Sequence, residues 1–165
     1  MNYHKIEKTS IANGEGIRVV LWVSGCSLHC RGCQNPKTWD LNSGRLFDKE
    51  AKKELFEALD KPYIQGITFS GGHPLEPENV EEVINLAKEI KEKFPTKDIW
   101  LYTGYSWEEI YYKQISRVLL YIDVLVDGKY IDEQRDLTLK WCGSRNQRVI
   151  NVKESLKENK IVLYN

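Results

Sequence analysis

Short apolar runs alternate with amphipathic segments along the whole chain. Runs rich in β-branched and aromatic residues predict strands. The clearest ones cover residues 17–23, 64–70, 98–103, 122–126 and 148–152. A further apolar run at residues 161–164 is too short to assign.

Three segments between these runs have apolar residues at helical spacing and predict helices over residues 48–60, 77–94 and 106–119. Asp48 is the expected N-cap of the first helix. Pro95 closes the second helix. Ser106 and Glu109 have the spacing of a capping box at the start of the third.

Alternating strands and helices predict βαβ units around a parallel sheet. A complete eightfold βα barrel takes ~250 residues, which leaves a chain of this length room for about five units. We therefore predict an α/β fold: an incomplete (βα) barrel with a mostly parallel sheet of about five strands and flanking helices. Residues 1–165 contain no repeat, low-complexity tract or linker, so we expect a single domain.

Parallel sheets of this kind bind ligands at the carboxyl ends of their strands. We expect four such ends to meet on one rim, with the barrel open at one side to admit a large substrate such as a loop of another protein. These four strand ends are followed by a cysteine-rich loop, Ser70-Gly71-Gly72, Thr103-Gly104 and Asp127-Gly128.

The charge balance narrows the class of partner. Lysine plus arginine and aspartate plus glutamate both number 24, so the formal net charge is zero. Proteins that bind nucleic acid or anionic membrane usually have a basic excess. No apolar run approaches the ~20 residues of a membrane span, and the polar N-terminus has no signal-peptide core. These features predict a cytoplasmic protein with reduced cysteines.

Three of the four cysteines, Cys26, Cys30 and Cys33, form a C-x3-C-x2-C motif in a loop over residues 24–39. Glycines and a proline in the loop disfavour a helix, so the thiols are not simply one apolar helix face. Clustered thiols in a reducing compartment are typical of a metal site.

Two kinds of metal site suit these thiols, with inert thiols as the remaining alternative. A structural zinc site has four protein ligands, and here His29 or the distant Cys142 would complete it. A 4Fe–4S cluster held by three cysteines keeps one iron without a protein ligand. We favour the cluster, and we expect Cys142 to be a spare buried thiol and His4 and His29 to be surface residues.

A second motif follows the predicted strand at residues 64–70, in the run Thr68-Phe-Ser-Gly-Gly-His-Pro-Leu75. The paired glycines, Gly71 and Gly72, would let a small ligand approach the backbone. An ordinary βα turn explains the same pattern, but its place on the predicted rim favours ligand binding.

The stretch from Asn13 to Asp40 resembles the N-terminal signature of radical S-adenosylmethionine enzymes. More narrowly, the chain is similar to the activases of glycyl-radical enzymes, and most similar to the family that activates anaerobic (class III) ribonucleoside-triphosphate reductase. This closer similarity rests on the short length, on Asp127-Gly-Lys-Tyr130 and on the block at residues 141–150, which contains Gly143-Ser-Arg-Asn-Gln-Arg148. The sister family, pyruvate formate-lyase activase, is longer and lacks that block.

The resemblance implies roles for specific residues. Cys26, Cys30 and Cys33 would ligate three irons of a 4Fe–4S cluster, and the fourth iron would chelate S-adenosylmethionine. Gly71 and Gly72 would meet the methionine amino group. Further residues would line the cofactor pocket: Gly32, Cys33, Gln34 and Thr103.

The family usually has an acidic residue where this chain has His73. We interpret His73 as a tolerated variant, although a histidine there would make the pocket's hydrogen bonding sensitive to pH. Asp127 is either a cofactor or cation ligand or, as we favour, part of an Asp-Gly turn. Arg145 and Arg148 would either dock a partner or form a solvated basic face.

The reaction implied by the resemblance starts when a reduced cluster passes an electron to S-adenosylmethionine and a 5′-deoxyadenosyl radical forms. That radical would remove a hydrogen atom from a glycine of the reductase large subunit. Reduced flavodoxin or a similar donor would supply the electron, with no nucleic acid or membrane partner. Two alternatives stay open: another small radical S-adenosylmethionine enzyme (a different activase, or one acting on a small molecule of the deazapurine type), and a zinc-stabilised interaction domain.

Overall fold

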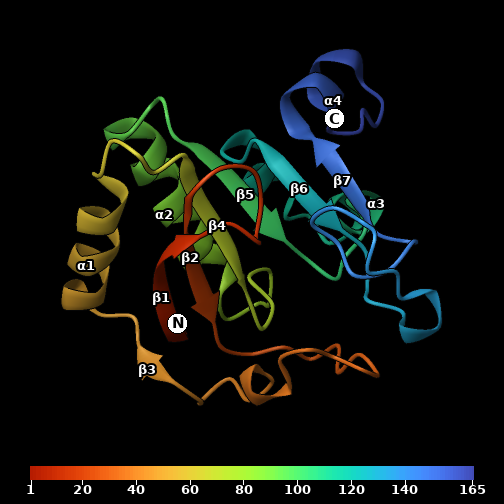
Figure 1. The fold of residues 1–165 in the computed structure, drawn as a ribbon, viewed down its shortest axis with the longest axis horizontal. Coiled ribbons are helices and arrows are strands. Elements are labelled where there is room, and N and C mark those ends of the chain that lie inside the picture. Colours follow the sequence, from red (N-terminus) through yellow and green to blue (C-terminus); the bar gives the residue numbers. More distant parts are fainter.

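The computed structural model describes residues 1–165 as an α/β fold built on one mixed sheet of seven strands, in the order β3-β1-β2-β4-β5-β6-β7 (Figure 1). The strands are β1 (Asn2–Ser10), β2 (Arg18–Val23), β3 (Arg45–Leu46), β4 (Gly66–Gly71), β5 (Asp98–Tyr102), β6 (Val124–Asp127) and β7 (Arg148–Asn151). The α-helices are α1 (Lys49–Leu59), α2 (Val80–Lys93), α3 (Trp107–Tyr112) and α4 (Val152–Glu158), and the 3-10 helices are η1 (Pro36–Thr38), η2 (Ser116–Leu120) and η3 (Asp132–Gln134).

The five predicted strands are present as β2, β4, β5, β6 and β7, but the predicted count of about five is wrong. The central strands β2, β4, β5 and β6 pair in parallel, whereas β1, β3 and β7 join by antiparallel pairing. The sequence did not indicate β1, in which only Tyr3 and Ser10 are buried. Its polar run becomes a strand because it pairs with β2. The two-residue β3 has no hydrophobic pattern of its own.

The predicted helices are present with different ends. Asp48 caps α1 by accepting from the Ala51 N–H at 2.9 Å, and the capping box of Ser106 and Glu109 opens α3. The helix predicted over 106–119 is divided, because Gln114 adopts a left-handed φ of 58° between α3 and η2. The sequence did not predict α4.

The main core lies on the helical face of the sheet, where 31 buried apolar residues form one cluster with α1 and α2. The other face carries a smaller cluster of Trp100, Val124 and Val126. The rings of Trp141 and Tyr164 pack edge-on against Trp100, with centroids 5.0 and 5.1 Å away. Aromatic side chains thus cover a sheet face that no α-helix of the main core covers.

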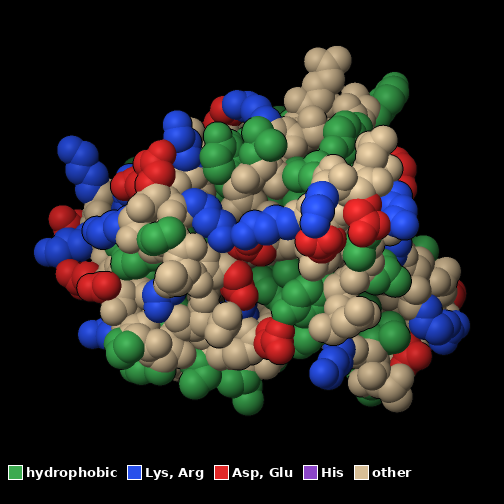
Figure 2. Space-filling view, turned by 90° about the horizontal axis from the view of Figure 1, so that it is seen from above, with side chains coloured by type: hydrophobic (Ala, Val, Ile, Leu, Met, Phe, Trp, Pro, Cys, Tyr) green, Lys and Arg blue, Asp and Glu red, His purple; other side chains and the backbone are tan.

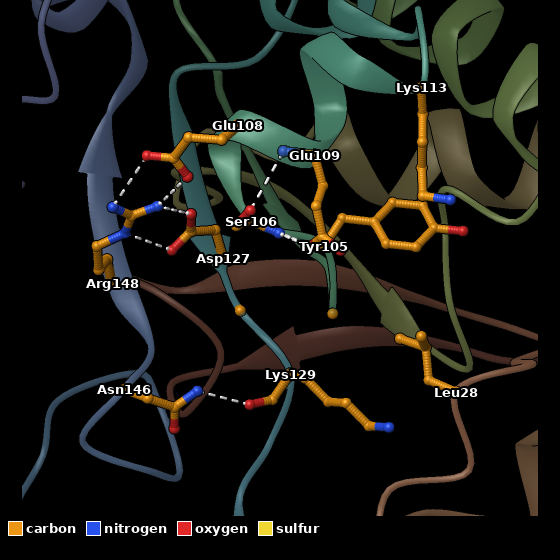
Figure 3. Close-up of a pocket in the computed structure, with 12 residues that line it drawn as sticks. Leu28, Tyr105, Ser106, Glu108, Glu109, Lys113, Asp127, Lys129, Asn146 and Arg148 are labelled. Atoms are coloured by element: carbon orange, nitrogen blue, oxygen red, sulfur yellow. Dashed lines mark hydrogen bonds and ion pairs between the residues drawn. The ribbon is translucent and has the colours of Figure 1, made fainter.

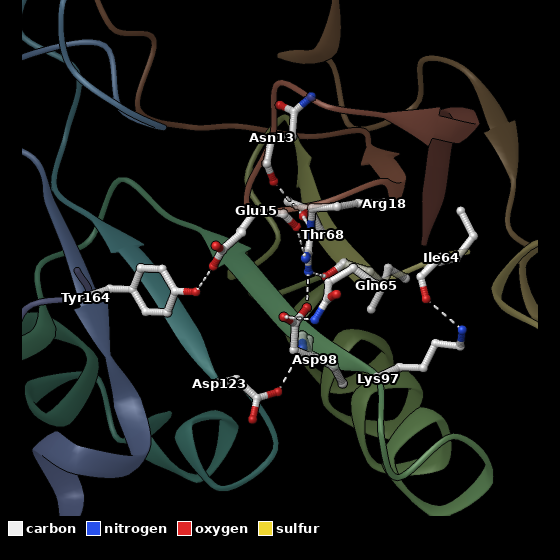
Figure 4. A network of polar contacts seen from close by, with 12 residues as sticks. Asn13, Glu15, Arg18, Ile64, Gln65, Thr68, Lys97, Asp98, Asp123 and Tyr164 are labelled. Carbon is white, nitrogen blue, oxygen red and sulfur yellow. Dashed lines mark hydrogen bonds and ion pairs between the residues drawn. The ribbon is translucent and has the colours of Figure 1, made fainter. Parts of the chain in front are cut away.

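Arg18 organises the strand starts on this second face (Figure 4). Its fully buried guanidinium donates to Thr68 Oγ1 at 2.9 Å and to Asp98 Oδ1 at 2.5 Å. It also donates to the carbonyl oxygens of Glu15 at 2.8 Å and Ile67 at 2.9 Å. A buried charge needs such partners, so this arginine ties the β1–β2 loop to β4 and β5.

Charged side chains of both signs are interspersed over the face shown in Figure 2, as the net charge of zero leads one to expect. None of the helices is both long enough and apolar enough to cross a lipid bilayer.

Candidate functional site

The cysteine loop, residues 24–39, leaves the carboxyl end of β2 and returns to it. Gly25 N–H donates to the Thr38 carbonyl at 2.7 Å, and Cys26 N–H donates to the Trp39 carbonyl at 3.0 Å. These two bonds close the loop at its base. Inside it, His29 and Gly32 have positive φ values of 43° and 75°, so the backbone coils without forming a helix.

The three motif cysteines are free and half-buried on this loop. Burial raises the pKa of the Cys26 thiol, against the opposing effect of backbone hydrogen bonds from Leu28 and His29. Cys33 Sγ accepts from the Asn35 N–H at 3.4 Å. Backbone N–H groups therefore already face two of the three sulfurs, an environment that would stabilise thiolate ligands.

The donor set fits an iron–sulfur cluster by its chemistry, since thiolates are the ligands that such clusters use. No three His, Cys, Asp or Glu side chains are gathered as a metal-binding group. Metal sites commonly assemble only as the metal binds and displaces thiol protons. A coiled, glycine-containing loop permits that assembly.

The two residues considered as a fourth zinc ligand lie in different surroundings. His29 stacks on Trp39 with ring centroids 4.5 Å apart. Cys142 packs with the aromatic cluster of the second sheet face, where burial raises the pKa of its thiol. We expected a buried thiol at Cys142, but it is only half-buried. It packs with Trp100 and its neighbours and not with the motif cysteines.

The end of β4 packs closely against the start of the cysteine loop at Gly71 and Gly72. A Cβ atom on Gly71 would lie 2.5 Å from Val23 N, and one on Gly72 would lie 2.5 Å from Gly25 O. Gly72 N–H donates to the Val23 carbonyl at 2.8 Å, and His73 N–H donates to the Gly25 carbonyl at 2.7 Å. Close backbone packing therefore requires both glycines.

A buried hydrogen-bonded chain connects the turn after β4 to the cysteine loop and to the end of β5. His73 is 1% exposed; its Nδ1 lies 3.1 Å from Glu76 Oε1 and its Nε2 lies 2.7 Å from Thr103 Oγ1. Glu76 Oε1 also accepts from the N–H and Oγ of Ser27, at 2.8 and 2.9 Å. The chain Ser27–Glu76–His73–Thr103 thus crosses from one strand end to the next.

The protonation states in this chain follow from its partners. The hydrogen bond from His73 is the main cause that lowers the pKa of Glu76 to about 2, with further lowering from Ser27. Glu76 is therefore an acceptor at neutral pH, and His73 Nδ1 donates to it. Thr103 Oγ1 accepts from the Tyr105 N–H at 3.0 Å and lies in hydrogen-bond contact with His73 Nε2.

The rim beyond Thr103 contains a polar cavity of about 610 Å³, lined by the ends of β5 and β6, the first turn of α3 and Leu28 of the cysteine loop (Figure 3). Asp127 is 1% exposed there, accepts from the Trp107 N–H at 2.7 Å and pairs with Arg148 at 2.5 Å. Arg148 also pairs with Glu108 at 2.9 Å. Asp127 is thus fully engaged by protein groups, and Arg148 belongs to an ion pair.

The other predicted residues differ in burial. Gln34 and Gly32 are exposed on the cysteine loop, and Thr103 is buried behind the rim. His4 is half-buried and lies 2.8 Å from Ser43 Oγ, whereas His29 is exposed. The sequence interpretation missed Glu76, because a carboxylate four residues beyond a glycine pair has no pattern that marks it.

Comparison with known proteins gives consistent matches. A family described as "4Fe-4S single cluster domain" matches residues 12–150. Three relatives carry the name "Anaerobic ribonucleoside-triphosphate reductase-activating protein". The one from Enterobacteria phage T4 is 49% identical over 90% of this chain and 93% of its own length. Those from Haemophilus influenzae and Escherichia coli K12 are 46% and 44% identical, over 89% and 90% of this chain and 96% and 97% of theirs.

Proposed function

We propose, on the premise that the chain belongs to the family of anaerobic ribonucleoside-triphosphate reductase-activating proteins, that it is the enzyme that installs the glycyl radical on such a reductase. One observation carries this proposal. The three-cysteine loop lies at the carboxyl ends of parallel strands, in a chain that matches these relatives over nine-tenths of its length.

Cys26, Cys30 and Cys33 are the proposed ligands of a 4Fe–4S cluster, and the rim around them is the proposed site for S-adenosylmethionine. Together, these two groups supply the one-electron chemistry that removes a hydrogen atom from a glycine of the reductase. The role proposed for the chain's own residues is to bind and orient these two groups. Gly32, Cys33, Gln34, Gly71 and Gly72 are the proposed residues of the S-adenosylmethionine pocket.

Thr103 has an indirect place in this proposal. Its hydroxyl is committed to His73 and to the Tyr105 N–H, so it supports the rim from behind. His73 occupies the position where the family usually has an acidic residue, and here Glu76 supplies a carboxylate three residues later. That carboxylate accepts hydrogen bonds from the N–H and Oγ of Ser27, the residue after Cys26.

Further parts of the proposal concern the whole protein. The single continuous sheet supports one domain over residues 1–165, and the parallel core β2-β4-β5-β6 supports a partial (βα) barrel of the radical S-adenosylmethionine type. Four free cysteines suit the cytoplasm. We assign the reductase large subunit as protein substrate, reduced flavodoxin or a similar donor as electron source, and no nucleic acid or membrane partner.

An anaerobic electron paramagnetic resonance experiment tests the function. The reduced, cluster-loaded protein is mixed with S-adenosylmethionine and the co-expressed reductase, and a glycyl doublet is expected on the reductase. S-adenosylmethionine cleavage without a doublet would point to another substrate, either a different glycyl-radical enzyme or a small molecule. Stoichiometric zinc without iron in anaerobically purified protein would support the zinc-stabilised interaction domain instead.

A further inference from the structure

The segment from Gly128 to Gln147, here called the strap, lies against the cysteine loop (Figure 1). Gly32 contacts it most closely, because a Cβ atom on Gly32 would lie 2.6 Å from Asp132 Oδ1. Tyr130 Oη donates to the same Asp132 oxygen at 3.0 Å, which orients the carboxylate. An exposed ion pair of Arg31 and Glu133, at 3.3 Å, adds a second contact.

The far end of the strap returns to the same place. A Cβ atom on Gly143 would lie 3.1 Å from the ring of Tyr130 and 3.7 Å from Gln34 Nε2. Both ends of the strap therefore meet the part of the cysteine loop that contains Cys33. The function proposed above gives the strap no role.

Side-chain hydrogen bonds from three polar residues within a four-residue stretch hold the two ends of the strap together. Gln147 Nε2 donates to the Gly128 carbonyl at 3.0 Å, while its Oε1 accepts from the N–H groups of Gly143 and Ser144 at 2.9 and 3.1 Å. Asn146 Nδ2 donates to the Lys129 carbonyl at 2.7 Å. Ser144 Oγ is fully buried and accepts from the Ile131 N–H at 3.2 Å.

Beyond these hydrogen bonds, Trp141 and Cys142 anchor the strap in the aromatic cluster of the second sheet face, and a backbone bridge pairs Arg135 with Ser144. The strap's only regular element is η3 and it contributes no residue to the main core. Leu137, near its middle, is 82% exposed. A segment with few buried apolar contacts opens locally at low free energy unless specific hydrogen bonds hold it.

We infer that Ser144, Asn146 and Gln147 are positioning residues for the cysteine loop. By joining the two ends of the strap they set Tyr130 and Asp132 against Gly32, and the strap in turn limits the motion of the loop between Cys30 and Cys33. The inference goes beyond the proposed function, since it concerns the loop's mobility whichever reaction the loop serves.

Hydrogen–deuterium exchange on the full-length, metal-free protein tests this inference without cluster, S-adenosylmethionine or reductase. In Gln147→Ala, amide exchange is expected to rise about five- to tenfold both in residues 128–135 and in residues 26–34, as for the loss of several hydrogen bonds at one side chain. The helices α1 and α2 should exchange as in the wild-type protein. Faster exchange in the strap with an unchanged cysteine loop would overturn the inference.

Two further variants keep the test decisive. Arg145→Ala is the matched control, because the side chain of Arg145 makes no hydrogen bond or ion pair and the substitution keeps the bond of its N–H to the Gln134 carbonyl. It should leave both regions unchanged. Asn146→Ala removes two hydrogen bonds, one to the Lys129 carbonyl and one from Ser144 Oγ, and gives a milder form of the same pattern should Gln147→Ala unfold. Gln147→Glu keeps the acceptor for Gly143 and Ser144 and should restore part of the protection.

The cluster-loaded protein provides a spectroscopic check. Gln147→Ala should alter the resonance lines of the reduced cluster, because the backbone around Cys33 is less restrained, whereas Arg145→Ala should not. Identical spectra for Gln147→Ala and wild-type protein would contradict a positioning role. Since neither measurement uses the reductase, failure here and failure of the proposed function are separate outcomes.

Discussion

The cysteine loop is supported on two sides, and the two supports differ in burial. On one side, the turn after β4 contacts the loop through close glycine packing and the buried carboxylate of Glu76. On the other, the strap contacts it through Gly32 and an exposed ion pair. A buried support strengthens the fold and the loop together. An exposed support restricts the motion of the loop and contributes little to the stability of the rest of the molecule.

The difference follows from where each support begins. The β4 turn continues a central strand, so disturbing it disturbs the main core. The strap connects β6 to the edge strand β7 and adds nothing to that core. Global stability and loop mobility should therefore respond differently to substitutions on the two sides, and the following predictions rank those responses.

The largest effect is expected within the loop itself. Cys26→Ala, Cys30→Ala or Cys33→Ala should each reduce S-adenosylmethionine cleavage to background, because each removes a proposed cluster ligand. Cys142→Ala is the matched control and should keep the cluster. Product chromatography with iron analysis measures both, and loss of iron from the Cys142 variant would show that the ligands are misassigned.

Gly72→Ala should damage the buried support strongly. Its Cβ would lie 2.5 Å from Gly25 O and 2.9 Å from Thr38 O, both backbone atoms that cannot rotate away. Overpacking of this kind costs about 1–3 kcal/mol. Denaturant unfolding of the metal-free protein measures the loss, with Gly128→Ala for comparison, where the nearest atom would lie 3.6 Å away but φ is 97°. An unchanged unfolding midpoint for Gly72→Ala would argue against tight packing here.

Glu76→Gln should destabilise the protein by about 1–2 kcal/mol at neutral pH, because the carboxylate that joins His73 to Ser27 is replaced. The pKa of Glu76 is about 2, below its ordinary value of 4.5. A lowered pKa means that this stabilisation is complete above pH 4.5 and is lost as the pH falls from there toward 2.

Unfolding curves of the metal-free protein over that pH range check this prediction. The wild-type protein should lose stability faster than Glu76→Gln as the pH falls, so the two free energies of unfolding should converge. Parallel pH dependences would mean that Glu76 contributes nothing through its charge.

The smallest effect is expected for Arg31→Ala in the exposed support. Its partner Glu133 is 3.3 Å away and both side chains are mostly in solvent. Such pairs contribute about 0–1 kcal/mol, so stability should change by less than the error of a denaturant measurement. A loss as large as that of Glu76→Gln would remove the distinction between the two supports.

Much of the fold could be predicted from the sequence, for a physical reason. Hydrophobic periodicity marks segments that are buried on one or both faces, so the four central strands, β7, α1 and α2 were found, although the ends of the helices differ. Caps are equally local, and the roles of Asp48 and Ser106 followed from neighbours in sequence. The strands β1 and β3 were missed because pairing makes them strands, β1 with β2 and β3 with β1, rather than any pattern of their own.

For the site, the sequence by itself determined which residues have the relevant chemistry: three thiols at a fixed spacing, a glycine pair and a polar block near the end. Only the tertiary structure decided what most of them touch. Glu76 reaches Ser27 across 49 positions, and Gln147 closes a turn 19 positions back at Gly128. Contacts at such separations depend on how the strands are ordered in the sheet, which local sequence patterns do not encode.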